Sequence, residues 1–147
     1  MASSSRLTVA RSDDTLVDTC VLLDTLTDDP TWADWSEAAM SSAGETGSLV
    51  VNAIIYAEVA AGFEAIEDLD EALPPDLFRR EPLPYHAGFL ASRAFLAYRR
   101  NSGTKRSPLP DFYIGAHAAV NGYRLLTRDT ARYQTYFPTL RLITPDR

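Results

Sequence analysis

The chain of 147 residues is poor in the residue types that build disulfides and zinc centres. It has one cysteine, Cys20, and two histidines. A single cysteine cannot close an intramolecular disulfide, and a structural zinc centre needs a Cys/His cluster that this sequence does not contain. These absences exclude a disulfide scaffold and a zinc module, and they favour a reducing, cytoplasmic setting.

Long apolar runs are also absent. The longest stretches without a charged residue span twelve positions, whereas a membrane-spanning helix needs about 18 apolar residues or more. The first residues include Arg6 and Arg11 but no apolar block typical of a signal peptide. We therefore expect no membrane association, a flexible N-terminal arm over residues 1–13 and a single domain over residues 14–147.

Basic residues are scarce overall but not in the second half of the chain. Fourteen Arg and Lys against twenty Asp and Glu give a net charge of -6, which by itself argues against nucleic-acid binding. Residues 1–78 carry sixteen acidic and two basic residues, a net -14, whereas residues 79–147 carry four acidic and twelve basic residues, a net +8. These two sums add to -6, so the average hides a strongly polarised chain.

Apolar patterning predicts strands that alternate with helices. Short apolar runs indicate five strands, at 15–17, 48–51, 77–83, 125–126 and 140–142. Helical periodicity indicates five longer helices, over 30–43, 53–62, 63–73, 85–100 and 110–121. The alternation predicts an α/β fold, a three-layer α/β/α sandwich around a mostly parallel sheet.

Four carboxylates occupy positions of interest in this fold. Asp18 and Asp129 each follow a predicted strand, at the sheet edge where parallel α/β folds bind ligands. Glu58 shares a helix face with apolar residues, so it must lose its hydration or find a cation. Asp111 opens the apolar central helix, on a face that continues through small residues.

Each of these residues also has a simpler explanation. Asp18, Asp129 and Thr127 could cap the helix or turn that follows them. Asp111 would interact favourably with a helix dipole, and Glu58 could belong to an ordinary polar stripe. Four carboxylates in one pocket would, however, repel one another unless a cation lay between them. Oxygen ligands without His or Cys suit Mg²⁺ or Mn²⁺, which can activate a water and stabilise the leaving oxygen of a phosphodiester.

Four short motifs carry these acids, and in this order they resemble the PIN-domain ribonucleases of the VapC toxin type. The motifs are LVDTCVLLD (16–24), NAIIYAEV (52–59), PLPDFYIGAHA (108–118) and LLTRD (125–129). The resemblance covers residues 15–145, with spacings of 40, 53 and 18 residues between successive acids.

The resemblance implies a quartet of catalytic, metal-binding acids formed by Asp18, Glu58, Asp111 and Asp129. Thr19 and Thr127 would support them with hydroxyl groups. It further implies Mg²⁺- or Mn²⁺-dependent endonucleolytic cleavage of RNA, a homodimer, and inhibition by a cognate antitoxin. Cys20 departs from the family pattern, which most often has Asn at this position, and we expect a small buried residue rather than a catalytic one.

Basic residues flank a predicted loop over 101–109. Arg99, Arg100, Lys105 and Arg106 could follow an RNA backbone toward Asp111, or they could form a solvated helix end; we favour RNA contact. The histidines, His86 and His117, are expected to be structural. The same holds for the aromatic residues near the end of the chain, Tyr133, Tyr136 and Phe137, which should pack in the core or at a dimer surface.

Two alternatives stay open. A non-catalytic PIN-like module would bind RNA or protein without cleavage, and Cys20 keeps this possibility alive. A receiver-type signalling domain also gathers acids around Mg²⁺. It would need an acidic pair after its first strand and a late lysine, whereas here Asp13 and Asp14 precede the strand and the only lysine, Lys105, lies in the predicted loop.

Overall fold

The computed structural model describes residues 10–101, 103–104 and 109–145. One sheet contains five strands, and all neighbouring strands are parallel, in the order β3-β2-β1-β4-β5. The strands are β1 (Thr15–Val17), β2 (Leu49–Asn52), β3 (Phe78–Glu81), β4 (Arg124–Leu126) and β5 (Leu142–Ile143). The predicted α/β fold with a parallel sheet is confirmed. Residues 1–9 of the expected N-terminal arm lie outside the described residues.

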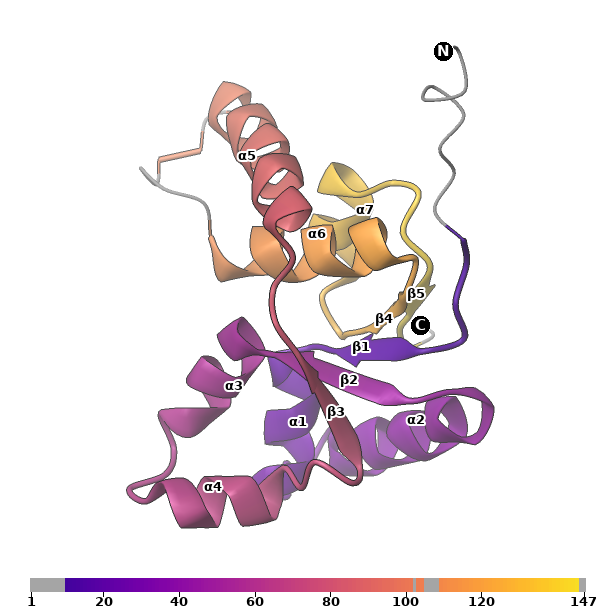
Figure 1. The fold of residues 1–147 in the computed structure, drawn as a ribbon, viewed down its shortest axis with the longest axis vertical. Coiled ribbons are helices and arrows are strands. Elements are labelled where there is room, and N and C mark those ends of the chain that lie inside the picture. Colours follow the sequence, from indigo (N-terminus) through magenta and orange to yellow (C-terminus); the bar gives the residue numbers. More distant parts are fainter. Residues whose placement is uncertain (1–9, 102, 105–108, 146–147) are drawn as a thin grey trace.

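Helices flank this sheet on both faces (Figure 1). Across the described residues they are α1 (Thr19–Leu26), α2 (Ala33–Thr46), α3 (Ala53–Ala60), α4 (Ile66–Ala72), α5 (Tyr85–Arg100), α6 (Pro110–Asn121) and α7 (Thr130–Tyr136). Figure 1 shows α1 to α4 on one side of the sheet and α5 to α7 on the other. This is the predicted three-layer arrangement. Within the described residues, none of the helices combines the length and apolar character needed to cross a membrane.

The central strands are apolar because helices cover both of their faces. Leu16 and Val17 of β1, Val50 of β2 and Leu125 of β4 have no exposed surface. Parallel strands that are buried on both faces show continuous apolar runs rather than alternation. This is why short apolar runs were sufficient to locate the strands in the sequence.

The order of the strands fixes where a ligand can bind. The chain leaves β1 through α1 and α2 toward β2 on one side, whereas it leaves β4 through α7 toward β5 on the other side. The connections therefore diverge at the carboxyl ends of β1 and β4. In open α/β sheets, ligands bind in the crevice at such a switch point.

Helix α6 is buried on nearly every side, as predicted. It begins at Pro110, and Gly122 ends it with a φ of 71°, a left-handed conformation that glycine adopts without strain. Phe112 is fully buried. A Cβ atom on Gly115 would lie 2.6 Å from the ring of Phe137, so this glycine lets α6 pack closely against the segment after α7.

Several element boundaries differ from those predicted, and at two of them a local turn explains the difference. Helix α2 begins three residues later than expected, since the side chain of Asp29 accepts hydrogen bonds from the backbone N–H groups of Thr31 and Trp32, both at 2.9 Å. Strand β5 begins two residues later than expected, because the N–H of Leu140 donates to the carbonyl of Phe137 at 3.0 Å and closes a turn there.

Candidate active site: carboxylates at the β1–β4 switch point

Asp18, Glu58 and Asp129 lie close enough to Asp111 for their charges to affect its ionisation. Asp18 follows β1, Glu58 lies on α3, Asp111 lies in the first turn of α6 and Asp129 precedes α7. Burial raises the pKa of Asp111 to about 6, and the negative charges of the other three acids add to the shift. The structure thus brings together the four acids that the sequence singled out, and we call this group the acid site.

Asp18 is the most deeply placed acid, with 5% of its surface exposed. Its Oδ1 accepts a hydrogen bond from the N–H of Thr19 at 2.8 Å, and its Oδ2 accepts one from the Thr127 hydroxyl at 2.7 Å. The Tyr133 hydroxyl donates to the same Oδ2 at 3.3 Å. Burial raises the pKa of Asp18, although these donors partly oppose it. The carboxylate is therefore fixed in one orientation by groups from three parts of the chain.

Glu58 is held from α1. The hydroxyl of Thr19 donates to its Oε1 at 2.6 Å. The buried side chains of α3 are Ile55 and Val59, whereas Glu58 is only half-buried. Glu58 therefore lies at the edge of the apolar face, closer to solvent than the helical periodicity indicated.

Thr127 links two of the acids. Its hydroxyl donates to Asp18 and accepts a hydrogen bond from the backbone N–H of Asp129 at 3.0 Å. Asp129 also caps α7, because its Oδ1 accepts from the N–H of Arg132 at 3.3 Å. Capping and membership of the acid site are thus compatible roles for Asp129, and the same is true of Asp18, which caps α1.

Cys20 borders the acid site without providing a thiolate. Its thiol lies 3.8 Å from Oδ2 of Asp18 and 3.9 Å from the Thr127 hydroxyl. Burial, together with the charge of Asp18, raises the pKa of the thiol to about 11. A protonated thiol is a poor metal ligand, so the donors in this region are oxygen atoms.

Two residues at the acid site were not assigned from the sequence. Arg132 places its Nε 3.4 Å from Oδ2 of Asp111 and 3.8 Å from Oδ2 of Asp129, and Tyr133 reaches Asp18. The apolar pattern predicted no helix after Asp129, but α7 is helical over Thr130–Tyr136. Helical spacing from Asp129 would have placed positions i+3 and i+4 near the acids.

The ligand atoms of the acid site are of the type that binds a hard divalent cation, but the carboxylates do not lie close enough together to form a complete metal site. In the described part of the chain, no three His, Cys, Asp or Glu residues form a group that could hold a metal ion as they stand. The donor set consists of oxygen atoms, and two of the acids have raised pKa values. Both features fit Mg²⁺ or Mn²⁺. An ion would have to draw the carboxylates closer together.

The predicted basic residues are only partly described. Arg99 and Arg100 are exposed in the last turn of α5, whereas Lys105 and Arg106 lie outside the described residues. Tyr98, beside Arg99, packs edge-on against Phe112, with ring centroids 5.6 Å apart. Since Phe112 follows Asp111, this aromatic contact connects the basic end of α5 to the helix that carries Asp111.

A partly buried ion pair supports the same region. Asp24 on α1 accepts two hydrogen bonds from Arg128, at 2.8 and 3.0 Å, and one from the Ser36 hydroxyl at 2.7 Å. The guanidinium carbon of Arg128 lies 4.9 Å from the centre of the Trp32 ring. These contacts connect α1 and α2 to the end of β4. They also give Asp24, the last residue of the first motif, a structural role.

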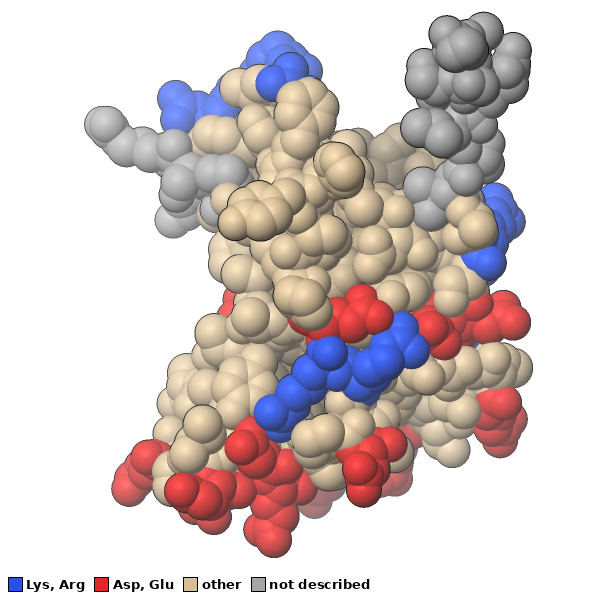
Figure 2. Space-filling view, in the orientation of Figure 1, with Lys and Arg blue, Asp and Glu red and all other residues tan. Residues whose placement is uncertain are grey.

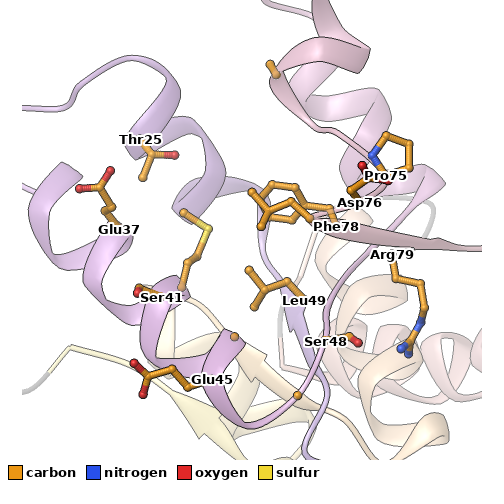
Figure 3. A pocket seen from close by; sticks show the side chains of 15 residues that line it. Thr25, Glu37, Ser41, Glu45, Ser48, Leu49, Pro75, Asp76, Phe78 and Arg79 are labelled. Atoms are coloured by element: carbon orange, nitrogen blue, oxygen red, sulfur yellow. The ribbon is translucent and has the colours of Figure 1, made fainter.

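One cavity of the described residues lies away from the acid site. It has a volume of about 730 Å³ and lies between α2 and the segment that leads into β3. Figure 3 shows Leu49 and Phe78 in its interior and the acidic side chains of Glu37, Glu45 and Asp76 around it.

Comparisons with known proteins agree with this geometry. The family described as "PIN domain" matches residues 15–138. The chain is similar in structure to the VapBC2 complex of Rickettsia felis bound to a promoter DNA fragment, with 14% identity and a TM-score of 0.71 over 90% of this chain and 99% of that chain. No curated protein sequence matches significantly.

Two further solved structures share the fold. FitAcB from Neisseria gonorrhoeae is 21% identical, with a TM-score of 0.65 over 89% of this chain and 97% of that chain. A toxin-antitoxin complex from Klebsiella pneumoniae is 19% identical, with a TM-score of 0.63 over 90% of this chain and 98% of that chain. At these identities the likeness shows the fold alone.

Proposed function

Because the chain belongs to the PIN domain family, we propose that it is a Mg²⁺- or Mn²⁺-dependent endoribonuclease that acts as the toxin of a toxin-antitoxin pair. The observation that carries this proposal is the convergence of four carboxylates at the switch point, where burial raises the pKa values of Asp18 and Asp111. Like charges held together in this way need a cation, and a nuclease site needs the same cation for its chemistry.

The residues divide into ligands and supports. Asp18, Glu58, Asp111 and Asp129 would hold the ion. Thr127 orients Asp18 and Thr19 orients Glu58 through hydrogen bonds of 2.7 and 2.6 Å. When bound, the divalent ion supplies activation of a water molecule and neutralisation of charge on the phosphodiester oxygens. The fixed orientation of Asp18 limits reorganisation during the reaction, which is how preorganised groups accelerate catalysis.

RNA is the proposed substrate because of where positive charge lies. The second half of the chain has a net charge of +8. Figure 2 shows part of this positive charge as a blue surface at the end of α5, away from the sheet. Arg99 and Arg100 belong to that end. Together with Lys105 and Arg106 of the following segment, they would contact phosphates of a strand whose cleavage site lies at Asp111.

Two surfaces suit the proposed protein partners. Helix α5 exposes Tyr85, Phe89 and Leu96 at 100%, 65% and 40% of their surface, and these positions share one helix face. We assign this face to a second copy of the chain in a homodimer. The cavity of Figure 3, with its apolar interior and acidic surroundings, suits a basic amphipathic segment of the antitoxin.

The test is a cleavage assay on unstructured RNA with Mg²⁺ or Mn²⁺. The wild type should cleave internally, and a chelator should abolish cleavage. Asp18→Asn and Asp111→Asn should each lower the rate by about 100-fold or more, because each removes a ligand and a charge from the proposed ion site. Asp68→Asn, which removes an exposed acid in the first turn of α4, should leave it unchanged. Cleavage that persists in both site variants would contradict the assignment, and RNA binding without cleavage would favour a non-catalytic module.

A further inference from the structure

Arg132 is the cation that the acid site already contains. Its Nε lies between two of the acids, 3.4 Å from Asp111 and 3.8 Å from Asp129. The guanidinium carbon lies 5.8 Å from the centre of the Phe112 ring. The charge of Arg132 is also the influence that opposes the raised pKa of Asp111. Without a bound metal, this side chain supplies part of the positive charge that the acids need.

The contacts of Arg132 are loose compared with those of other arginines in the molecule. Arg128 meets Asp24 at 2.8 and 3.0 Å, and Arg79 meets Asp14 at 2.9 Å. The distances from Arg132 to its two acids exceed the range of a good charge-assisted hydrogen bond. Moreover, its Nη1 is buried and lacks a hydrogen-bond partner in the described structure. A guanidinium group with spare donors and long ion pairs is poised to exchange its partners.

Space for another arrangement lies next to this side chain. A cavity of about 330 Å³ is lined by Tyr98, Asp129, Arg132, Thr135 and Tyr136, together with Ala131. The side chain of Arg132 is 30% exposed, so solvent and a ligand can reach it. The lining combines a cation with two aromatic rings, which suits a phosphate and a neighbouring base of single-stranded RNA.

We propose that Arg132 is a resident counter-ion: it neutralises Asp111 and Asp129 while no metal is bound, yields them to the divalent ion, and then contacts a phosphate of the RNA. The inference rests on the proposed function. The planar guanidinium can donate two parallel hydrogen bonds to a phosphate. Each charged group keeps a partner of opposite charge in this exchange. The divalent ion takes the place of the guanidinium beside the acids, and the RNA phosphate becomes the new partner of the guanidinium.

Mn²⁺ affinity, measured by calorimetry without RNA, tests the first half of this proposal. Arg132→Gln should bind Mn²⁺ about fivefold more tightly than the wild type, because the ion no longer competes with a resident cation. Arg132→Lys keeps the charge and should stay close to wild type. Arg93→Gln makes the same change of net charge on α5 and should not alter the affinity at 0.15 M salt, where distant charges are screened.

Cleavage kinetics at saturating Mn²⁺ test the second half. Arg132→Gln should lower kcat/KM for RNA about tenfold or more, and Arg132→Lys should recover part of the loss. Equal or weaker Mn²⁺ binding by Arg132→Gln, or the same gain in Arg93→Gln, would overturn the counter-ion role. Unchanged cleavage would overturn the phosphate contact. A wild-type protein that binds no Mn²⁺ would instead refute the proposed function, and circular dichroism would show whether each variant is folded.

Discussion

Among the described residues, two clusters of carboxylates have pKa values shifted in opposite directions. The first is the acid site. The second, which we call the β3 network, consists of Asp14, Arg79, Glu81, His117 and Tyr123. In the acid site, burial raises the pKa values of Asp18 and Asp111. In the β3 network the pKa values of Asp14 and Glu81 are lowered.

The β3 network pairs both of its carboxylates, although the buried Nε2 of His117 makes no hydrogen bond within the described structure. Arg79 bridges Asp14 at 2.9 Å and Glu81 at 2.8 Å, and the Tyr123 hydroxyl donates to Glu81 at 2.6 Å. Burial would raise the pKa of Glu81, but the bonds from Tyr123 and Arg79 outweigh it; for Asp14, the N–H of Ser48 is the main cause of the decrease. Figure 2 shows the corresponding band of adjacent red and blue side chains over β3.

His117 completes the β3 network in a neutral form. Oδ1 of Asn52 accepts from the N–H of Ile55 at 3.0 Å, so its Nδ2 must donate to Nδ1 of His117, 2.9 Å away. The imidazole therefore carries its proton on Nε2, which approaches Oε1 of Glu81 at 3.4 Å. Burial lowers the pKa of His117, so this arrangement is retained at neutral pH.

The contrast is the one expected between carboxylates that stabilise a fold and carboxylates that serve a function. A protein that needs acids only for stability pairs them, as in the β3 network. Acids that are held near one another with insufficient positive charge lower stability, and such groups are typical of functional sites. The acid site therefore has an electrostatic deficit that a divalent cation would correct.

The largest expected effect is stabilisation by metal. At a Mn²⁺ concentration 100 times the Kd, ligand binding should raise the free energy of unfolding by about 2.7 kcal/mol. Asp111→Asn should lose most of this gain, whereas Asp14→Asn in the β3 network should keep it despite a lower starting stability. Denaturant unfolding with Mn²⁺ or with a chelator measures both. Equal stabilisation of the two variants would place the ion outside the acid site.

In the next prediction, two acid-to-amide substitutions change the free energy of unfolding in opposite directions when no metal is present. Glu81→Gln should lower the free energy of unfolding by about 2 kcal/mol, because it breaks a partly buried network around Arg79. Asp111→Asn should raise the free energy of unfolding by about 1 kcal/mol at pH 7.5, since the substitution removes a charge that burial and the neighbouring acids disfavour. This value allows for solvent screening, because the Asp111 side chain is 33% exposed. Urea unfolding in the presence of a chelator measures both values. Destabilisation by both changes would show that the acid site has no electrostatic deficit.

The pH dependence follows from the raised pKa of Asp111. Its folded value of about 6 exceeds the ordinary value of 3.8, so the folded protein binds this proton more readily than the unfolded chain does. The destabilising charge is fully present above pH 6 and disappears as the pH falls toward 4. The advantage of Asp111→Asn over wild type should therefore shrink to nothing across that range, when the two are compared by urea unfolding at each pH. A constant advantage would argue against titration of Asp111 as its cause.

Much of the acid site could be predicted because its members follow local patterns. Asp18 and Asp129 come directly after apolar runs that form strands, and the first turn of an apolar helix contains Asp111. Those positions depend only on the nearby sequence and on the rule that parallel strands share one carboxyl edge. The same patterns located the sheet, although turns at Asp29 and near Leu140 moved two boundaries.

The remaining features depend on contacts between distant parts of the chain. Arg79 and Asp14 are 65 residues apart, and Arg128 and Asp24 are 104 residues apart. Nothing in the local sequence distinguishes these pairs from solvated surface charges. Tyr133 was assigned to packing because its ring is apolar, but its hydroxyl reaches Asp18 only once α7 is placed beside β1.

The smallest expected effect comes from the same change made in each cluster, tyrosine to phenylalanine. Tyr123→Phe should lower the free energy of unfolding by about 1 kcal/mol, because Glu81 loses a 2.6 Å bond and Arg79 loses an acceptor at 3.1 Å. Tyr133→Phe should cost only about 0.5 kcal/mol, since its bond to Asp18 is 3.3 Å long and Asp18 keeps Thr127. Thermal and urea unfolding of the two variants give the comparison. A larger loss for Tyr133→Phe would mean that this hydroxyl is a main support of Asp18, and that the acid site is better satisfied than its distances indicate.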